Sequence, residues 1–156
     1  MKGGIFLNSY IIKSNTYALI PVGSKTRVIE EDSCFIIEDL PTSIINLNCC
    51  LNGSTLEGRQ KGTAYLIGTS YKTPIVVSDK SNIILFPTRS IRNSSCIWIA
   101  LHGILCYKQY GSKVIVEFRN NQKIMLDISY NIFDRQVLRA TRLESALHGR
   151  NIQKSL

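Results

Sequence analysis

The chain has 156 residues, of which 44% are hydrophobic and 19% are charged, the balance of a folded globular protein rather than of a disordered or fibrous chain. No apolar run approaches the roughly 18 residues that span a bilayer, and polar residues interrupt the N-terminal MKGGIFLNSYIIKSNTY too early for a signal peptide. The composition therefore excludes a membrane-spanning protein and predicts one cytoplasmic domain over residues 1–156.

The net charge of +8 is unevenly distributed. Residues 1–52 carry four basic and five acidic side chains, net −1, whereas residues 53–156 carry fifteen basic and six acidic side chains, net +9. This asymmetry favours a polyanionic partner, either nucleic acid or an anionic membrane surface, over a small neutral substrate. A solvated basic surface that keeps the protein soluble is the alternative.

Three short strands are predicted in the first quarter of the chain. They are rich in β-branched residues, are bounded by Gly, Pro or acidic turns, and cover residues 16–22, 26–31 and 34–39. The acidic run Glu30, Glu31 and Asp32 is interpreted as a solvated hairpin turn.

Two helix-start signals follow. Pro41 and Thr42 open PTSIINLNCCLNG, which predicts a helix over 42–51. The stretch GSTLEGRQKG (53–62) begins with a Ser-x-x-Glu capping box, but its glycines at 58 and 62 predict that this second helix ends at once. Arg59 and Lys61 then lie on a flexible loop whose bare N–H groups can approach a phosphate. A solvated basic turn is the alternative, and the missing Gly-x-x-x-x-Gly-Lys-Ser/Thr spacing disfavours ATP hydrolysis.

Strand patterns return after residue 62. The runs TAYLIGT, PIVV, NIILF and CIWIALHGILCY are β-branched or aromatic and predict strands at 63–69, 74–77, 82–86 and 96–107. The turn RNNQ, with two residues that tolerate a left-handed backbone, predicts a hairpin between strands at 113–118 and 123–128.

The C-terminal segment predicts an amphipathic helix over about 130–148, capped by Ser129. One face carries the apolar residues Phe133, Val137, Ala140, Leu143 and Leu147. The other carries Arg135, Arg139 and Arg142, within about 60° of one another. The predicted fold class is α+β: a mostly antiparallel, curled sheet or barrel with short central helices, closed by this helix.

Catalytic and metal-site patterns are weak. The chain lacks Gly-x-Ser-x-Gly, and a dyad of His102 with Cys96 or Cys106 is the one nucleophile arrangement to consider. The cysteines are odd in number, five, and form no Cys-x-x-Cys pair, which predicts reduced, buried thiols without a disulfide. We therefore expect no enzyme activity, no metal and no cofactor.

Several segments resemble the ComK family of competence transcription factors from low-GC Gram-positive bacteria. The segments are NGSTLEGRQKGTAY, SYKTPIVVSDKSNIILFPT, CIWIALH and LDISYNIFDRQVLR. Their order and spacing match the family between about Cys34 and Leu147. They include the family hallmarks FPT (86–88) and ISYN (128–131). The resemblance implies a cytoplasmic activator of DNA-uptake genes that binds paired A·T-rich boxes, largely through the minor groove, as a homo-oligomer. It also implies RNA polymerase and a protease adaptor as partners. Familiar members continue beyond the amphipathic helix with a tail linked to adaptor recognition and activation, so a chain ending at Leu156 is interpreted as a short paralogue.

A narrow, strongly negative A·T minor groove favours inserted Arg and Lys side chains over a recognition helix. The candidate DNA-binding residues are therefore the loop-borne Arg59, Lys61, Arg89 and Arg92; Lys72 and Lys123, which align with basic family positions; and Arg135, Arg139 and Arg142 on the helix, of which Arg139 aligns with the family arginine of the QVxR pattern. The aromatic residues Tyr65, Tyr71, Phe86, Trp98 and Phe118 are expected in the core. The alternative function is a module whose basic face meets an acidic protein or lipid headgroups.

Overall fold

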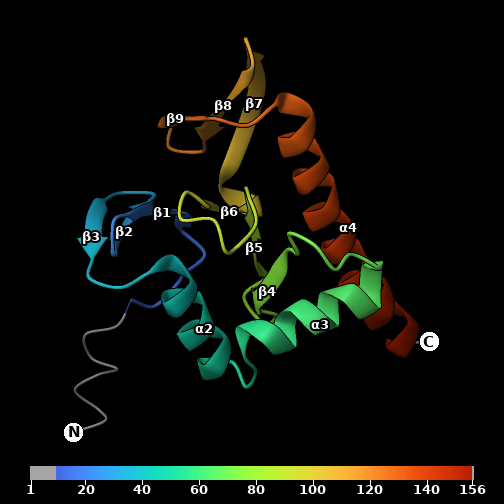
Figure 1. Ribbon diagram of the computed structural model, residues 1–156. Coiled ribbons are helices and arrows are strands. Elements are labelled where there is room, and N and C mark those ends of the chain that lie inside the picture. The colour runs from blue at the N-terminus through green and yellow to red at the C-terminus, as the bar shows by residue number, and fades with distance from the viewer. Residues whose placement is uncertain (1–9, 156) are drawn as a thin grey trace, which may run out of the picture.

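A six-stranded antiparallel sheet crosses the middle of the molecule (Figure 1). The computed structural model describes residues 10–155, with side chains described as far as residue 149. The strand order is β3-β2-β1-β6-β5-β4. The strands are β1 (Thr16–Val22), β2 (Lys25–Glu30), β3 (Cys34–Ile37), β4 (Ile75–Ser78), β5 (Ile83–Pro87) and β6 (Trp98–Ala100). The first three confirm the predicted strands.

A second, three-stranded antiparallel sheet stands over one face of the first (Figure 1). It consists of β7 (Ile104–Tyr110), β8 (Lys113–Phe118) and β9 (Lys123–Leu126). The turn between β8 and β9 places Asn121 at φ 70°, as the Asn-Asn turn predicts. The α+β class is confirmed, and the two sheets do not close into a barrel.

Two apolar clusters cover the two faces of the large sheet. Along β5, Ile84 and Phe86 point into the cluster shared with the small sheet and α4 (Tyr130–Ser155), whereas Ile83 and Leu85 point into the cluster shared with α2 (Pro41–Leu51). This alternation is the two-residue period of a strand that is buried on both sides. Helix α2 confirms the predicted helix over 42–51, with Pro41 in its first turn.

Helix α4 packs against the sheets through its apolar stripe. The hydroxyl of Ser129 accepts a hydrogen bond from the Ile132 amide at 3.2 Å, which confirms the predicted cap. Phe133, Ala140, Leu143 and Leu147 are buried, and Val137 is half-buried. The helix runs on to Ser155, past the end predicted at 148. No helix among residues 10–155 has the length and apolar character needed to cross a bilayer.

The prediction for the segment after Gly53 is wrong. Helix α3 spans Leu56–Ile67 and includes both the expected loop at 58–62 and most of the expected strand at 63–69. Thr55 caps it by accepting the Gly58 amide at 2.9 Å, and Gly68, at φ 73°, ends it with a left-handed residue. Glycine inside a helix costs only about 1 kcal/mol relative to alanine. Tertiary contacts offset that cost: Leu66 and Ile67 pack against the apolar cluster, and the buried hydroxyl of Thr63 donates to the Pro74 carbonyl at 2.7 Å, which ties α3 to the sheet.

The expected single strand over 96–107 is divided between the two sheets. β6 belongs to the large sheet and β7 to the small one, and a 3₁₀ turn, η1 (Leu101–Gly103), changes the direction between them. A side chain at Gly103 would lie 2.6 Å from the Tyr17 ring, so this close approach requires glycine.

Glu30 corrects the prediction of a solvated acidic turn. Its carboxylate is only 7% exposed and accepts hydrogen bonds from Tyr10 and Ser33, whereas Glu31 and Asp32 are exposed as expected. The prediction for the N-terminal segment falls largely on residues 1–9, which lie outside the described residues.

Candidate nucleic-acid interface

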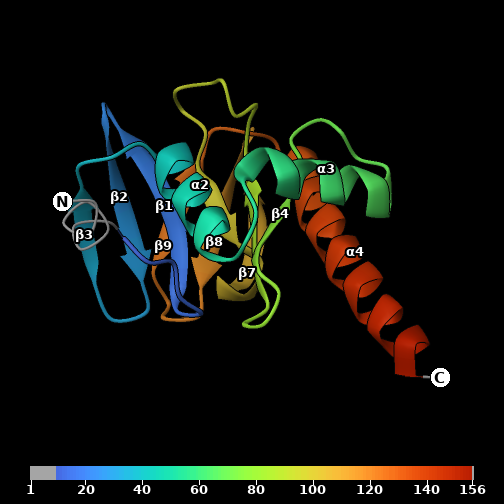
Figure 2. The ribbon, with the colours of Figure 1, turned by 90° about the horizontal axis from the view of Figure 1, so that it is seen from below.

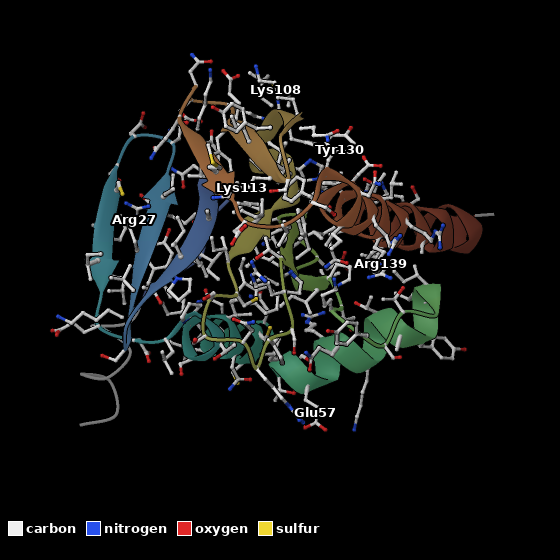
Figure 3. All side chains as sticks on the ribbon, turned by 45° about the horizontal axis from the view of Figure 1, so that its top comes forward. Arg27, Glu57, Lys108, Lys113, Tyr130 and Arg139 are labelled. Carbon is white, nitrogen blue, oxygen red and sulfur yellow. The ribbon has the colours of Figure 1, made fainter. Side chains whose placement is uncertain are left out.

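A cleft of about 530 Å³ separates the exposed side of α3 from the loop that joins β5 to β6. Three cations from three different segments line it: Lys61 from α3, Lys72 from the 68–74 segment and Arg92 from the 88–97 loop. Its acidic side chain is Glu57, on the first turn of α3 (Figure 3), which pairs with Lys61 at 3.3 Å. The cleft is open and cationic, which suits an extended anion rather than an enclosed small molecule.

The 88–97 loop is a short, internally bonded structure. The amide of Thr88 donates to the Ile97 carbonyl at 2.9 Å, and the Ile97 amide donates to the Thr88 hydroxyl at 3.0 Å, so these two residues close its base. At its tip, Asn93 accepts the Ser95 amide at 2.8 Å. Arg92 is exposed on a loop held by these bonds, so less conformational entropy is lost when it engages a ligand.

The 68–74 segment presents Lys72 in a conformation that few lysines adopt. Lys72 has φ 49°, in the left-handed region, and its ammonium lies 5.6 Å from the centre of the Tyr71 ring. Thr73 and Pro74, directly after it, are buried. The segment is therefore anchored at its end while Tyr71 remains 62% exposed.

The start of α4 adds two arginines beside these loops. Arg135 is exposed and Arg139 half-buried, and Figure 3 shows Arg139 on the side of α4 that faces α3. Figure 2 shows the 88–97 loop and the 68–74 segment projecting from the same side of the molecule, with the start of α4 between them. Arg89 extends from the base of the 88–97 loop, and its guanidinium donates to the main-chain carbonyl of Asp127, just before α4.

Lys72 and three of the arginines act on one another electrostatically. Burial lowers the pKa of the Lys72 ammonium below its ordinary value of 10.5. The positive charges of Arg139, Arg135 and Arg89 lower it further. A bound anion would relieve this repulsion, so the arrangement is suited to phosphate. We call the surface formed by Lys61, Lys72, Arg89, Arg92, Arg135 and Arg139 the cationic face.

Three of the nine candidate residues lie apart from this face. Arg59 and Lys61 are about 200° apart around α3, and Arg59 instead donates to the Asn52 carbonyl at 3.2 Å on the other side of the helix. Lys123 begins β9 and lies roughly 13 Å along the strand direction from Asp127, the residue whose carbonyl accepts the bond from Arg89. Arg142 is exposed one helical turn beyond Arg139, about 5 Å farther along α4, and does not line the cleft. Arg59 and Lys61 therefore lie on a helix and not on the expected flexible loop, and the contact of either residue with a phosphate stays a prediction.

The aromatic residues divide into two groups. Phe86, Trp98 and Phe118 are fully buried, as expected. Tyr65 and Tyr71 are 90% and 62% exposed, so their expected core position is wrong. Both were assigned from a strand pattern or from aromatic character alone, without the helical register of α3 that turns Tyr65 outward.

Sequence reasoning also missed Gln136. This side chain is only 1% exposed, and its Nε2 atom donates to the carbonyl oxygens of Lys72 at 2.9 Å and Pro87 at 2.7 Å. A signal was present, because a polar residue three positions after Phe133 lies on the apolar stripe of the helix. Buried polar side chains are retained where they are fully hydrogen-bonded.

The proposed nucleophile arrangements are not formed. His102 bonds to Asn82 and Glu144, whereas the Cys106 thiol bonds to Glu117 and the Cys96 thiol to the Arg89 carbonyl. All five cysteines are free; Cys49 and Cys96 are buried, whereas Cys34, Cys50 and Cys106 are exposed, against expectation. Among the described residues no three His, Cys, Asp or Glu side chains are grouped to hold a metal.

Comparisons with known proteins agree with the family resemblance. The family model described as ComK protein matches residues 7–151. The chain is 33% identical over 149 residues to the competence transcription factor of Bacillus subtilis (strain 168), an alignment that covers 92% of this chain and 78% of that protein. No solved structure matches the chain. The chain belongs to the ComK protein family.

Proposed function

We propose that this protein is a sequence-specific DNA-binding activator of competence genes, which binds A·T-rich boxes largely through the minor groove by means of the cationic face. Membership of the ComK family and the 33% identity to a competence transcription factor make it a competence transcription regulator. The mode of DNA binding and the residues that contact DNA are the proposal.

The observation that carries the proposal is the convergence of six cations from four separate segments on one face. Phosphate contacts from such residues supply the sequence-independent part of DNA affinity. Arg92, at an exposed loop tip, has the form of a side chain that enters a narrow groove, because an A·T minor groove concentrates negative potential along its floor. On this side of the molecule the 88–97 loop and the 68–74 segment project outward, rather than an exposed recognition helix (Figure 2).

The family resemblance supports further parts of the proposal. We expect a single DNA-binding domain that forms a homo-oligomer on paired boxes in the cytoplasm. RNA polymerase and a protease adaptor are its proposed protein partners.

Equilibrium binding by fluorescence anisotropy tests the proposal. A duplex that carries paired A·T-rich boxes should bind in the presence of excess nonspecific DNA, and a G·C-rich duplex of equal length should bind far more weakly. Distamycin, which occupies A·T minor grooves, should displace the protein, whereas methylation of major-groove edges should have little effect. Equal affinity for both duplexes would contradict sequence-specific binding. Binding to anionic vesicles without binding to DNA would favour the lipid-headgroup alternative.

A further inference from the structure

Gln136 joins three parts of the cationic face from beneath. It lies on the buried stripe of α4, between Phe133 and Ala140, both of which are fully buried. Its two amide hydrogens are directed at the carbonyl oxygens of Lys72 and Pro87, at 2.9 and 2.7 Å. Its Oε1 atom accepts a hydrogen bond from Arg139 Nη1 at 2.8 Å. Both donors and the acceptor of the amide are therefore engaged.

Each partner of Gln136 belongs to a different element of the face. The bond to Lys72 fixes the main chain at the residue with φ 49°, a conformation that a lysine rarely holds without support. The bond to Pro87 lies one residue before Thr88, which closes the base of the 88–97 loop. The bond to Arg139 restrains the guanidinium itself.

The chemistry of this position requires an amide. Methionine fills a similar volume but offers no donor, so it would leave the partly buried Lys72 carbonyl and the buried Pro87 carbonyl without their bonds to this side chain. Glutamate retains an acceptor for Arg139 but loses both donors. Lysine offers donors but no acceptor for the guanidinium.

We propose that Gln136 is a positioning residue for DNA binding: without touching DNA, its buried amide sets the spacing between Lys72, the 88–97 loop and Arg139. This inference rests on the proposed function of the cationic face, and it identifies Gln136 as the residue that holds the parts of that face in place. DNA affinity should therefore depend on a side chain that is only 1% exposed.

The test compares Gln136→Met with a matched control. Asn48 on α2 is also buried, at 2% exposure, and makes three hydrogen bonds: it accepts from the Ile12 amide and donates to the Tyr10 and Ile44 carbonyls. Asn48→Leu removes the same number of side-chain hydrogen bonds, three, outside the cationic face. Gln136→Met should weaken binding to the A·T-rich duplex by about tenfold or more. Asn48→Leu should lower the melting temperature by a similar amount and leave affinity unchanged at a temperature where both proteins are folded.

A double-mutant cycle separates positioning from a general loss of structure. Arg139→Met alone should weaken binding by about tenfold, whereas in the Gln136→Met background the same change should cost less than about threefold, because the guanidinium is already released. An equal loss in both backgrounds would show that Arg139 acts independently and would overturn the proposal.

Amide hydrogen exchange gives a readout without DNA. In Gln136→Met, residues 68–74 and 88–97 should exchange faster than in the wild type, whereas in Asn48→Leu they should not. If Gln136→Met does not fold, Gln136→Asn supplies the same measurement, because it keeps an uncharged amide but is one methylene too short to reach all three partners. Unchanged exchange in both segments would overturn the proposal, even if the wild type binds DNA. Faster exchange in a protein that binds no DNA would refute the proposed function and leave the positioning geometry intact.

Discussion

The ring of Phe86, at the end of β5, meets the ring of Phe133, on α4, edge to face with their centres 5.6 Å apart. Phe86 opens the FPT segment and Phe133 lies one turn after Ser129, so this contact links the two segments that carry the family hallmarks. Both rings are fully buried. The contact fixes α4 against the strand from which the 88–97 loop emerges, and it thereby sets the two halves of the cationic face relative to each other.

Phe133→Ala should therefore destabilise the protein by about 3–5 kcal/mol, the usual cost of removing a buried phenylalanine ring. Leu138→Ala is the matched control on the same helix, because Leu138 is 57% exposed and its loss should change stability by no more than about 0.5 kcal/mol. Urea unfolding followed by circular dichroism measures both. Similar losses for the two variants would mean that the buried face of α4 is wrongly assigned.

Gly62→Ala should stabilise the protein by about 0.5–1 kcal/mol. Gly62 lies inside α3 with nothing within 4 Å of the position of an added Cβ atom, and alanine is the better helix former. Gly68→Ala should do the opposite, because φ 73° at the end of α3 strains any residue with a side chain. Thermal unfolding of the two variants distinguishes a helix from the loop that the sequence pattern suggests. Destabilisation by Gly62→Ala would argue against the helix.

Local sequence patterns correctly predicted the elements for which local propensity and tertiary packing favour the same structure. The strands near Thr16, the Asn121 turn and the Ser129 cap each follow from residues close in sequence. The α3 segment could not be predicted in this way, because its glycines and β-branched residues oppose a helix. Contacts with distant residues favour the helix instead, among them the packing of Leu66 and Ile67 on the core and the buried bond from Thr63 to Pro74, eleven residues away.

The candidate site was predictable in composition but not in geometry. Charge asymmetry and family segments identified the cations, and six of the nine gather on one face. The separation of Arg59 from Lys61 depends on the helical register of α3. The role of Gln136 depends on contacts with Lys72 and Pro87, which are 64 and 49 residues distant along the chain. The position of Gln136 on the apolar stripe indicates that it is buried, but no local pattern identifies its distant partners.

Lowering the pH should remove the stabilisation that the buried Glu30 carboxylate contributes to the fold. Burial alone raises the pKa of Glu30, but hydrogen bonds from Tyr10 and Ser33 and the Lys13 ammonium, 3.2 Å away, outweigh it and hold the pKa below its ordinary value of 4.5. Because the folded-state pKa is the lower one, the carboxylate stabilises the fold above the unfolded pKa, and this stabilisation is lost as the pH falls through the folded pKa.

Glu30→Gln should therefore flatten the fall of stability below about pH 4.5. Glu38→Gln should not, because the side chain of Glu38 is 82% exposed. Urea unfolding at a series of pH values measures the slopes. If the free energy of unfolding of Glu30→Gln falls with pH in parallel with that of the wild type, protonation of Glu30 does not cause the loss of stability.

Thiol modification of the folded protein should label three of the five cysteines and leave two unlabelled. Cys34, Cys50 and Cys106 are exposed, whereas Cys49 and Cys96 are buried. Burial raises the pKa of the Cys49 thiol to about 11 and also raises that of Cys96, so both resist conversion to the reactive thiolate. At pH 8, iodoacetamide should label the first three in the folded protein and all five in urea, as read by peptide mass spectrometry. Rapid labelling of Cys49 in the folded protein would contradict its position on the buried face of α2.

The salt dependence of DNA affinity tests the cationic face most directly. The logarithm of the binding constant should fall linearly with the logarithm of salt concentration, with a slope near −0.9 for each phosphate neutralised. Lys72→Ala combined with Arg92→Ala should weaken binding to every duplex, flatten the slope by about two units and leave the melting temperature nearly unchanged. Lys108→Ala is the control, because Lys108 lies on the small sheet away from Arg139 (Figure 3) and its loss should leave the slope unaltered. An unchanged slope in the double variant, or an equal change in Lys108→Ala, would place the DNA elsewhere on the protein.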